Sequence, residues 1–240
     1  MRYLVLLAGM GRRMGREYAQ TPKCLVDVGG EPLVARLLRQ IRSADAQADV
    51  HVVLGFQSEA IMPWVRGCEI VVNPFFDITG VNASLWFARA SFDRMLTVIH
   101  GDVVLSDALA ADLFATAAPS LVAYDSGVLD PLEINVAVAE GRVTRFGVNF
   151  EGYAGAYAGI VKLSAHAARV FADTLDHRIR RGFNEPRTYY FFVMRRLIAD
   201  PDVRFVPFDV ARRGYWEVDR PEDLQRLRHA LAGDGLVAAR

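Results

Sequence analysis

The sequence predicts an α/β protein built on a doubly wound sheet of mixed strand direction. Two observations support this class: short runs of β-branched and aromatic residues recur along the 240-residue chain, and stretches with helical spacing separate them. Strands that alternate with helices in this way form parallel βαβ units. Ligands of such sheets bind beyond the carboxyl ends of the strands, so the residues that follow each strand are the candidates for function.

The alternation extends from the first residues to about residue 125. The expected strands are 3–8, 50–55, 69–73, 96–102 and 120–125. Helical spacing over 31–44 predicts a helix with one apolar face, formed by Leu33, Val34, Leu37, Leu38 and Ile41. Helices are also expected over 82–92 and over 106–118, where Ser106 is a natural N-cap.

The pattern changes between about residues 125 and 163, where alternating polar and apolar residues indicate an antiparallel insertion. Residues 133–147 are typical of a hairpin that turns at Glu140 and Gly141, and residues 154–164 predict another strand. The remaining elements are helices over 165–181, 188–200 and 221–231 and strands over 203–209 and 214–218. With no internal repeat and no long linker, residues 1–240 are expected to form a single domain.

Composition argues against several classes of function. The chain has 28 lysine and arginine residues and 28 aspartate and glutamate residues. It therefore lacks the surplus of basic residues that is typical of nucleic-acid binding. No apolar run approaches the roughly 20 residues of a membrane span, and the first residues lack the pattern of a secretion signal. Cys24 and Cys68 have no CxxC partner, which predicts reduced thiols in a cytoplasmic protein. The oligomeric state stays open.

A glycine- and arginine-rich loop follows the first strand. Gly9 and Gly11 let the backbone approach a ligand closely and aim N–H groups at it, and Arg12 and Arg13 add forked donors suited to phosphate oxygens. The loop lacks the Gly-Lys-Ser/Thr ending of a Walker loop, and Met14 replaces the third glycine of a dinucleotide fingerprint. The loop therefore predicts an anion site of another kind, with a plain turn and solvated arginines as the alternative.

The wider context of this loop resembles a known signature. "LLAGMGRRM" followed by "TPKCLVDVGGEPLV" is similar to the motif of nucleotidyltransferases that activate sugar 1-phosphates and small phospho-alcohols. "NPFFDITGVNASLWFARA", "VIHGDVVLS" and "YWEVDRPEDLQRL" resemble further segments of the bacterial phosphocholine cytidylyltransferases, in the same order. The resemblance covers nearly the whole chain and implies the Rossmann-like fold of the nucleotide-diphospho-sugar transferase type.

The resemblance also implies a reaction and roles for residues. A phosphate oxygen of an acceptor would attack the α-phosphorus of CTP and release pyrophosphate, so the protein must position and neutralise two polyanions. The implied catalytic cations are Arg13 and Lys23. Asp102 and Asp219 would hold Mg²⁺, which one or two carboxylates together with phosphate oxygens suffice to bind. The residues expected around the nucleotide are Ala8, Gly9, Gly11, Arg12, Thr79, Asn82 and Ser84.

Two polar residues near these motifs have structural alternatives. Asp219 precedes "RPE", so it could be an N-cap that forms a capping box with Glu222 instead of a metal ligand. His100 precedes the Gly-Asp pair, but a lone histidine on a buried strand is usually a core residue, and no role is assigned to it.

The acceptor site is the least defined part of the sequence. An acceptor such as phosphocholine needs aromatic faces and a carboxylate around its cationic group. The candidates for acceptor binding are Tyr153, Tyr157, Arg187, Tyr189, Trp216 and Glu217, and the wider set adds Tyr190, Asp125, Glu133 and Glu185. The chain has Asn135, Val148 and Ala156 where the family carries two lysines and a glutamate, which disfavours a sugar phosphate and also plain phosphocholine. Arg187 is the candidate replacement cation.

Three functions therefore remain in competition. The first is a Mg²⁺-dependent cytidylyltransferase that acts on a small phosphorylated alcohol or phosphonate. The second is a sugar-1-phosphate nucleotidyltransferase, and the third is a nucleotide-binding module that has lost turnover. The intact glycine loop, Pro-Lys pair and Gly-Asp pair favour an enzyme.

Overall fold

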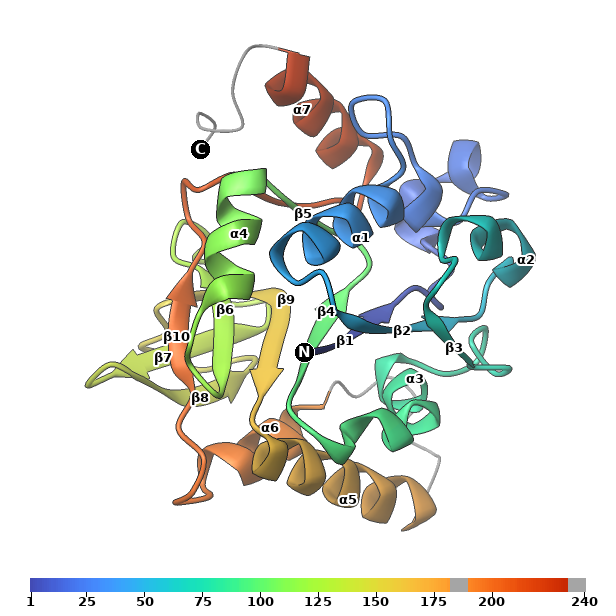
Figure 1. Cartoon of the computed structure of the whole chain (residues 1–240). Coiled ribbons are helices and arrows are strands. Elements are labelled where there is room, and N and C mark those ends of the chain that lie inside the picture. Colours follow the sequence, from blue (N-terminus) through green and yellow to red (C-terminus); the bar gives the residue numbers. More distant parts are fainter. Residues whose placement is uncertain (182–189, 233–240) are drawn as a thin grey trace.

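The computed structural model describes residues 1–181 and 190–232 and is organised around one large sheet (Figure 1). The strands of this sheet are β1 (Arg2–Leu6), β2 (Asp49–Leu54), β3 (Glu69–Val72), β4 (Leu96–His100), β6 (Leu121–Asp125), β7 (Asn135–Ala139), β8 (Arg142–Gly147), β9 (Gly155–Leu163) and β10 (Val206–Asp209). They follow the order β10-β6-β9-β4-β1-β2-β3, and β7 joins β8 to β9. Two short strands, β5 (Val103–Leu105) and β11 (Tyr215–Glu217), pair with each other in antiparallel fashion.

The strand directions confirm a mixed sheet. β2 and β4 flank β1 and run parallel to it, β3 runs parallel to β2, and β10 runs parallel to β6. β9 runs antiparallel to both β4 and β6, and all of its residues are buried. The last strand expected for the insertion is therefore a central strand of the main sheet, and the β7–β8 hairpin is the antiparallel addition at its end.

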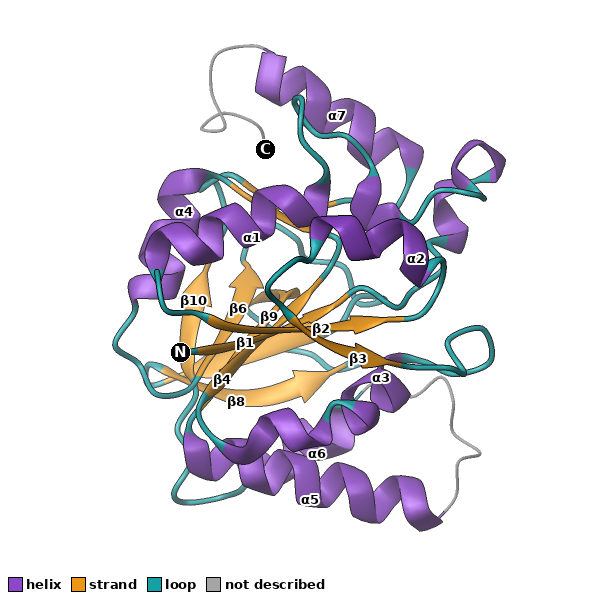
Figure 2. Cartoon of the chain, turned by 45° about the vertical axis from the view of Figure 1, so that its right-hand side comes forward, coloured by secondary structure: helices purple, strands orange, loops and turns teal. Residues whose placement is uncertain are grey.

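Helices cover both faces of the sheet (Figure 2). They are α1 (Leu33–Ala44), α2 (Ser58–Ile61), α3 (Val81–Phe87), α4 (Asp107–Ala115), α5 (Ala165–Arg181), α6 (Phe191–Ile198) and α7 (Pro221–Ala232). α1, α2 and α4 pack on one face and α3, α5 and α6 on the other, which is the doubly wound arrangement predicted from the sequence. Within the described residues, no helix has the length and apolar character that crossing a membrane requires.

Local signals in the sequence account for some element boundaries. Ser106 caps α4, because its Oγ accepts a hydrogen bond from the Leu109 N–H at 3.1 Å. The β7–β8 hairpin turns at Glu140 and Gly141, both of which have positive φ. β5 and α2 were not predicted, because three or four residues are too few to establish a periodicity.

A small apolar cluster joins the two ends of the chain. Met14 of the glycine loop and Val26 pack with Trp216 of β11 and with Leu224 and Leu227 of α7. Each of these side chains is at least nine-tenths buried. Their burial holds the loop after β1 against β11 and so brings residues near position 219 to the end of β1.

The carboxyl ends of β1 and β4 lie side by side in register, with Leu6 opposite His100. Gly101 continues this pairing, because its N–H donates to the Leu6 carbonyl at 3.0 Å. A Cβ atom on Gly101 would lie 2.5 Å from that carbonyl oxygen and 2.6 Å from Leu7 Cδ2. The Gly-Asp pair therefore needs glycine in order to place Asp102 beside the end of β1.

We expect Gly101→Ala to lower the free energy of unfolding by about 1–3 kcal/mol, the usual cost of forcing a methyl group into packed structure. Urea denaturation measures this loss. Gly9→Ala is the matched control, because a Cβ there meets nothing within 4 Å, and we expect it to change stability by less than about 0.5 kcal/mol. Equal losses in the two variants would contradict the packing argument.

Candidate functional site

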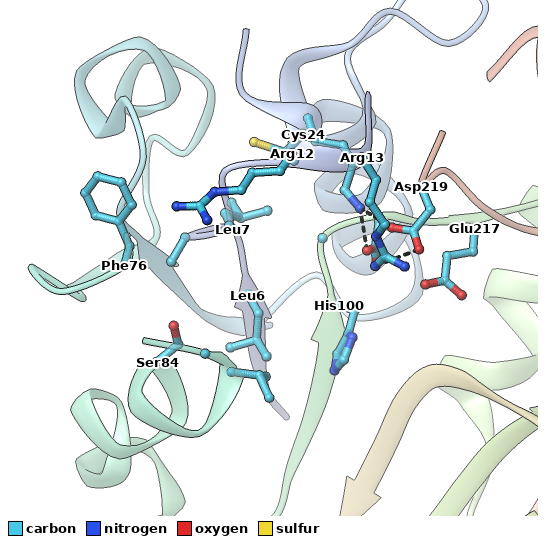
Figure 3. A pocket seen from close by; sticks show the side chains of 18 of the residues that line it. Leu6, Leu7, Arg12, Arg13, Cys24, Phe76, Ser84, His100, Glu217 and Asp219 are labelled. Carbon is cyan, nitrogen blue, oxygen red and sulfur yellow. Dashed lines mark hydrogen bonds and ion pairs between the residues drawn. The ribbon is translucent and has the colours of Figure 1, made fainter. Parts of the chain in front are cut away.

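A pocket of about 470 Å³ opens at the carboxyl ends of β1 and β4, a size typical of small-molecule sites. The predicted residues that line it are Ala8, Gly9, Gly11, Arg12, Arg13, Lys23, Thr79, Ser84, Asp102, Glu217 and Asp219. Figure 3 shows Phe76 and Ser84 on one side of this pocket, Asp219 and Glu217 on the other, and His100 between them. The glycine loop and the Gly-Asp pair therefore face one crevice, as the strand pattern predicts.

The Lys23 side chain lies at the centre of the charged side of the pocket. Its Nζ donates to Asp102 Oδ2 at 2.7 Å and to Asp219 Oδ1 at 2.9 Å, and Arg13 forms an ion pair with the other Asp219 oxygen at 2.8 Å. Burial opposes the charge on Lys23, but the two carboxylates outweigh this effect and raise the pKa of Lys23. Burial likewise opposes the charge on Asp102, and the Lys23 ammonium nevertheless lowers the pKa of Asp102.

Local structure places Lys23 at this position. It begins a 3₁₀ turn, Lys23–Leu25, in which the Leu25 N–H donates to the Pro22 carbonyl at 2.8 Å. The next side chain, Cys24, anchors the turn in the apolar core, where burial raises the pKa of its thiol to about 12. Gly11 approaches from the loop with a positive φ of 59°, and a Cβ there would lie 3.2 Å from Lys23 Cβ. Glycine at position 11 therefore allows the loop to lie directly on Lys23.

Arg12 points away from this cluster. Its guanidinium donates to the Asp77 carbonyl at 3.2 Å and so links the glycine loop to the segment that follows β3. Arg13 keeps 67% of its side-chain area exposed although it pairs with Asp219. Arg12, Arg13 and Lys23 all line the pocket and together form a positive wall suited to a polyanion.

A buried asparagine organises the opposite wall. The Asn73 side-chain amide donates to Thr79 Oγ1 at 3.2 Å and to Ser84 Oγ at 3.1 Å, and its Oδ1 accepts from the Phe75 N–H at 3.0 Å. Asn73 was missed as a site residue, although it belongs to the Asn-Pro-Phe segment that carries the resemblance. Asn82 does not line the pocket, because it is buried within α3.

The Asp219 carboxylate faces the pocket and not the first turn of α7. Asp223 caps that turn, because its Oδ2 accepts from the N–H groups of Asp219 at 3.0 Å and Arg220 at 2.8 Å. The capping box of Asp219 and Glu222 therefore does not form, because the Asp223 carboxylate caps this turn instead. The Asp219 carboxylate is thus available to Lys23, Arg13 or a cation.

The carboxylates of this wall fit a divalent cation. Asp102, Glu217 and Asp219 each offer an oxygen, and these oxygens lie within 4.8 Å of one another. Asp102 Oδ1 is buried and has no hydrogen-bond partner among the described residues, so it can accept a further ligand. Removal from bulk water and the charge of Asp102 raise the pKa of Glu217 to about 8, although its side chain borders the open pocket. Clustered carboxylates are the donor set that Mg²⁺ prefers.

The acceptor-side predictions are the ones the structure changes most. Tyr157 and Trp216 lie in apolar clusters, and Tyr153 packs edge-on against Phe150, so none of the three lines the pocket. Tyr157 uses its hydroxyl to accept a hydrogen bond from Tyr190 at 2.8 Å. Arg187, Tyr189 and Glu185 lie outside the described residues. Glu217 and Glu133 do line the pocket.

His100 is a pocket residue that sequence reasoning set aside. Its ring lies at the end of β4, on the floor of the pocket, and its Nε2 is 3.4 Å from the Tyr190 hydroxyl (Figure 3). Burial lowers the pKa of His100, so the ring is neutral at physiological pH. Its position immediately before the Gly-Asp pair at a strand end is the signal that could have identified it.

The fold and the site have the features expected of the nucleotidyltransferase family: a doubly wound sheet with a glycine-arginine loop, a lysine and clustered aspartates at the ends of its central strands. The chain belongs to the family of MobA-like NTP transferase domains, whose sequence model matches residues 3–146. The resemblance drawn from the motifs is therefore confirmed at the level of the family.

Similar proteins agree with this assignment. The CMP-5'-(3-aminopropyl)phosphonate synthase of Streptomyces rubellomurinus is 30% identical over 93% of this chain, which spans 37% of that protein. The CTP:phosphocholine cytidylyltransferase of Streptococcus pneumoniae superposes with a TM-score of 0.79 at 19% identity, over 96% of this chain and 98% of that one. The inositol-1-phosphate CTP transferase of T. maritima gives 0.69 at 18% identity, over 99% and 98%. These structural likenesses confirm the fold.

Because the pKa of Asp102 is lowered in the folded protein, we expect part of the protein's stability to be lost in acid. The Asp102 pKa is lower in the folded protein than the ordinary 3.8, so its stabilising contribution is present above about pH 4 and is lost as the pH falls through its folded value. We expect Asp102→Asn to be less stable than the wild type at pH 7 and the difference to narrow towards pH 3, measured by urea unfolding. Asp173→Asn, at an exposed position of α5 without a hydrogen bond in the described structure, is the control. A difference that stays constant from pH 7 to pH 3 would contradict the pairing with Lys23.

Proposed function

We propose that this protein is a cytidylyltransferase that couples CTP to a small phosphorylated alcohol or phosphonate. One acceptor oxygen forms a bond to the α-phosphorus of CTP, the bond from that phosphorus to the bridging oxygen of the β-phosphate breaks, and pyrophosphate leaves. The observation that carries the proposal is the position of Lys23, which lies beside the glycine loop and between two strand-end aspartates. A cation there can neutralise the reacting phosphates of both substrates.

The position of Lys23 suggests a role for each of the neighbouring pocket residues. In the proposed reaction, Gly9, Gly11 and Arg12 bind the β- and γ-phosphates, and Arg13 neutralises charge that develops on the leaving pyrophosphate. Nucleotide binding would draw Arg13 and Lys23 from Asp219 to the phosphates. Such groups act mainly by positioning and by electrostatic stabilisation, since phosphoryl transfer needs little covalent chemistry from the protein.

We assign a Mg²⁺ ion to Asp102 and Asp219, with Glu217 beside it. When bound, the ion supplies positive charge that offsets the phosphate oxygens. The buried, unpartnered Oδ1 of Asp102 supports this assignment within the described residues. Lys23 lies between the two aspartates and lowers the pKa of Asp102, so the Asp102 carboxylate is ionised and able to bind a cation.

The choice of CTP rests on the relatives, because two similar proteins have names that include CTP and a third makes a CMP conjugate. In our proposal Thr79 and Ser84, fixed by Asn73, contact the nucleoside, and Asn82 supports α3 from within. We place the reaction in the cytoplasm, where free thiols such as Cys24 stay reduced.

Pyrophosphate release tests the proposed function directly. The protein is incubated with Mg²⁺, each of the four nucleoside triphosphates in turn, and a panel of phospho-alcohols, aminoalkyl phosphonates and hexose 1-phosphates. We expect pyrophosphate with CTP and a small acceptor, and we expect EDTA to abolish it. Release only with a hexose phosphate would move the assignment to a sugar-1-phosphate nucleotidyltransferase. Nucleotide binding without any release would make the chain a binding module.

A further inference from the structure

The charges that line the pocket are divided between two regions. Arg12, Arg13 and Lys23 form the positive wall next to the glycine loop, while Glu133 and Glu217 lie on the wall made by β11 and the segment before β7. Asp102 and Asp219 are ion-paired to the cations of the first region. Glu217 shares its candidate cation site with Asp102 and Asp219, so among the described residues Glu133 is the pocket carboxylate that remains for a ligand.

Within residues 1–181 and 190–232, Glu133 has no cation paired with it. Among the described residues, no lysine, arginine or histidine forms an ion pair with its carboxylate, and its side chain makes no hydrogen bond to them. It is nevertheless in the lining of the pocket, next to Ile134. A carboxylate that lines a ligand pocket without a partner of its own is a candidate for binding a cationic group of the ligand.

The backbone of Glu133 is fixed by a buried amide. The Asn135 Nδ2 donates to the Asp130 carbonyl at 2.9 Å and to the Glu133 carbonyl at 3.0 Å. Two further hydrogen bonds close the turn from Asp130 to Glu133. The Glu133 N–H donates to the Asp130 carbonyl at 3.2 Å, and the Leu132 N–H donates to Asp130 Oδ1 at 2.9 Å. Four hydrogen bonds thus hold a turn of four residues.

Asn135 itself is an unusual residue for a buried strand. Its side chain has no exposed area, and its Oδ1 has no hydrogen-bond partner among the described residues. Burying an amide with an unsatisfied oxygen costs free energy, so the benefit of this residue lies in the two bonds that its NH₂ group makes to the turn. The turn that presents Glu133 is therefore specified from the core and is not an accident of a surface loop.

We propose that Glu133 is a specificity residue that binds a protonated amine of the acceptor, and that Asn135 is the positioning residue that holds it. This inference rests on the proposed function and deepens it by naming the acceptor class. The acceptor carries a phosphate or phosphonate at one end, which lies near Lys23, and an ammonium group at the other, which lies near Glu133. A bipolar molecule matches a pocket that carries both a positive wall and the separate carboxylate of Glu133.

The test compares two acceptors of similar length, 3-aminopropylphosphonate and butylphosphonate, which differ in a terminal ammonium or methyl group. With CTP and Mg²⁺, we expect the wild type to prefer the amine at least ten-fold in kcat/KM. We expect Glu133→Gln to raise the KM for the amine about ten- to hundred-fold, the usual size of a lost charge-assisted bond. Its kcat, its KM for CTP and its activity with butylphosphonate should stay as in the wild type. Glu151→Gln, an exposed glutamate outside the pocket, should change nothing.

The role of Asn135 has a separate readout. Asn135→Asp keeps the shape of the side chain and removes both donated bonds, so we expect the same rise in KM for the amine. The double variant with Glu133→Gln should then be no worse than either single variant, because both changes remove one interaction. Additive losses, or a loss shared equally by both acceptors, would reduce Asn135 to a structural residue.

The outcomes separate this inference from the proposed function. If no acceptor yields pyrophosphate with CTP, the proposed function fails and the inference fails with it. If the wild type uses both acceptors equally well, or if Glu133→Gln leaves the KM for the amine unchanged, the proposed function stands and the role of Glu133 is overturned. Where Asn135→Asp does not fold, the Glu133→Gln comparison decides the acceptor class alone.

Discussion

The contact of the Lys23 ammonium with Asp102 and Asp219 is the interaction on which the rest of the site depends. Two aspartates from distant parts of the chain lie near each other in a partly buried pocket, and they would repel each other without a cation between them. Lys23 supplies that cation and gains a raised pKa in return. The partly buried Lys23 thus forms a stable arrangement with the two carboxylates.

The fold provides for this contact at each step. Parallel pairing of β1 with β4 places the glycine loop beside the Gly-Asp pair. Because Gly101 has no side chain, the two segments can lie in close contact. The apolar cluster around Met14 and Trp216 brings β11, and therefore Asp219, to the same edge. Asp223 caps α7, so the Asp219 carboxylate is not needed there. Packing far from the pocket thus determines which carboxylates reach it.

The sequence predicts the nucleotide half of the molecule well, because short motifs there carry strong local constraints. Glycines at positions 11 and 101, the Pro-Lys pair and the strand ends all reflect backbone requirements that a sequence displays directly. β5 and α2 are too short to show a period, and β9 was assigned to an insertion because its place between β4 and β6 depends on long-range pairing. The availability of the Asp219 carboxylate also depends on a neighbouring residue, because Asp223, and not Glu222, caps the first turn of α7.

The acceptor half was predicted less well for a different physical reason. Aromatic residues such as Tyr157 and Trp216 serve equally in a core and in a ligand cage, and only packing tells the two apart. Asn135 gives no sign in the sequence that it is buried under a turn. Tyr153, Tyr157 and Trp216 do not line the pocket whereas Glu133 does, so our proposal bases acceptor choice on charge and not on aromatic stacking.

The most direct test of this account is the turnover number of Lys23→Met in the CTP reaction, measured on protein whose folding is verified by thermal melting. If Lys23 leaves the aspartates to neutralise the reacting phosphates, kcat should fall by about 10²–10³-fold, the usual loss when one preorganised charge is removed. The KM for CTP should change much less. A kcat within a few-fold of the wild type would contradict the central place given to Lys23.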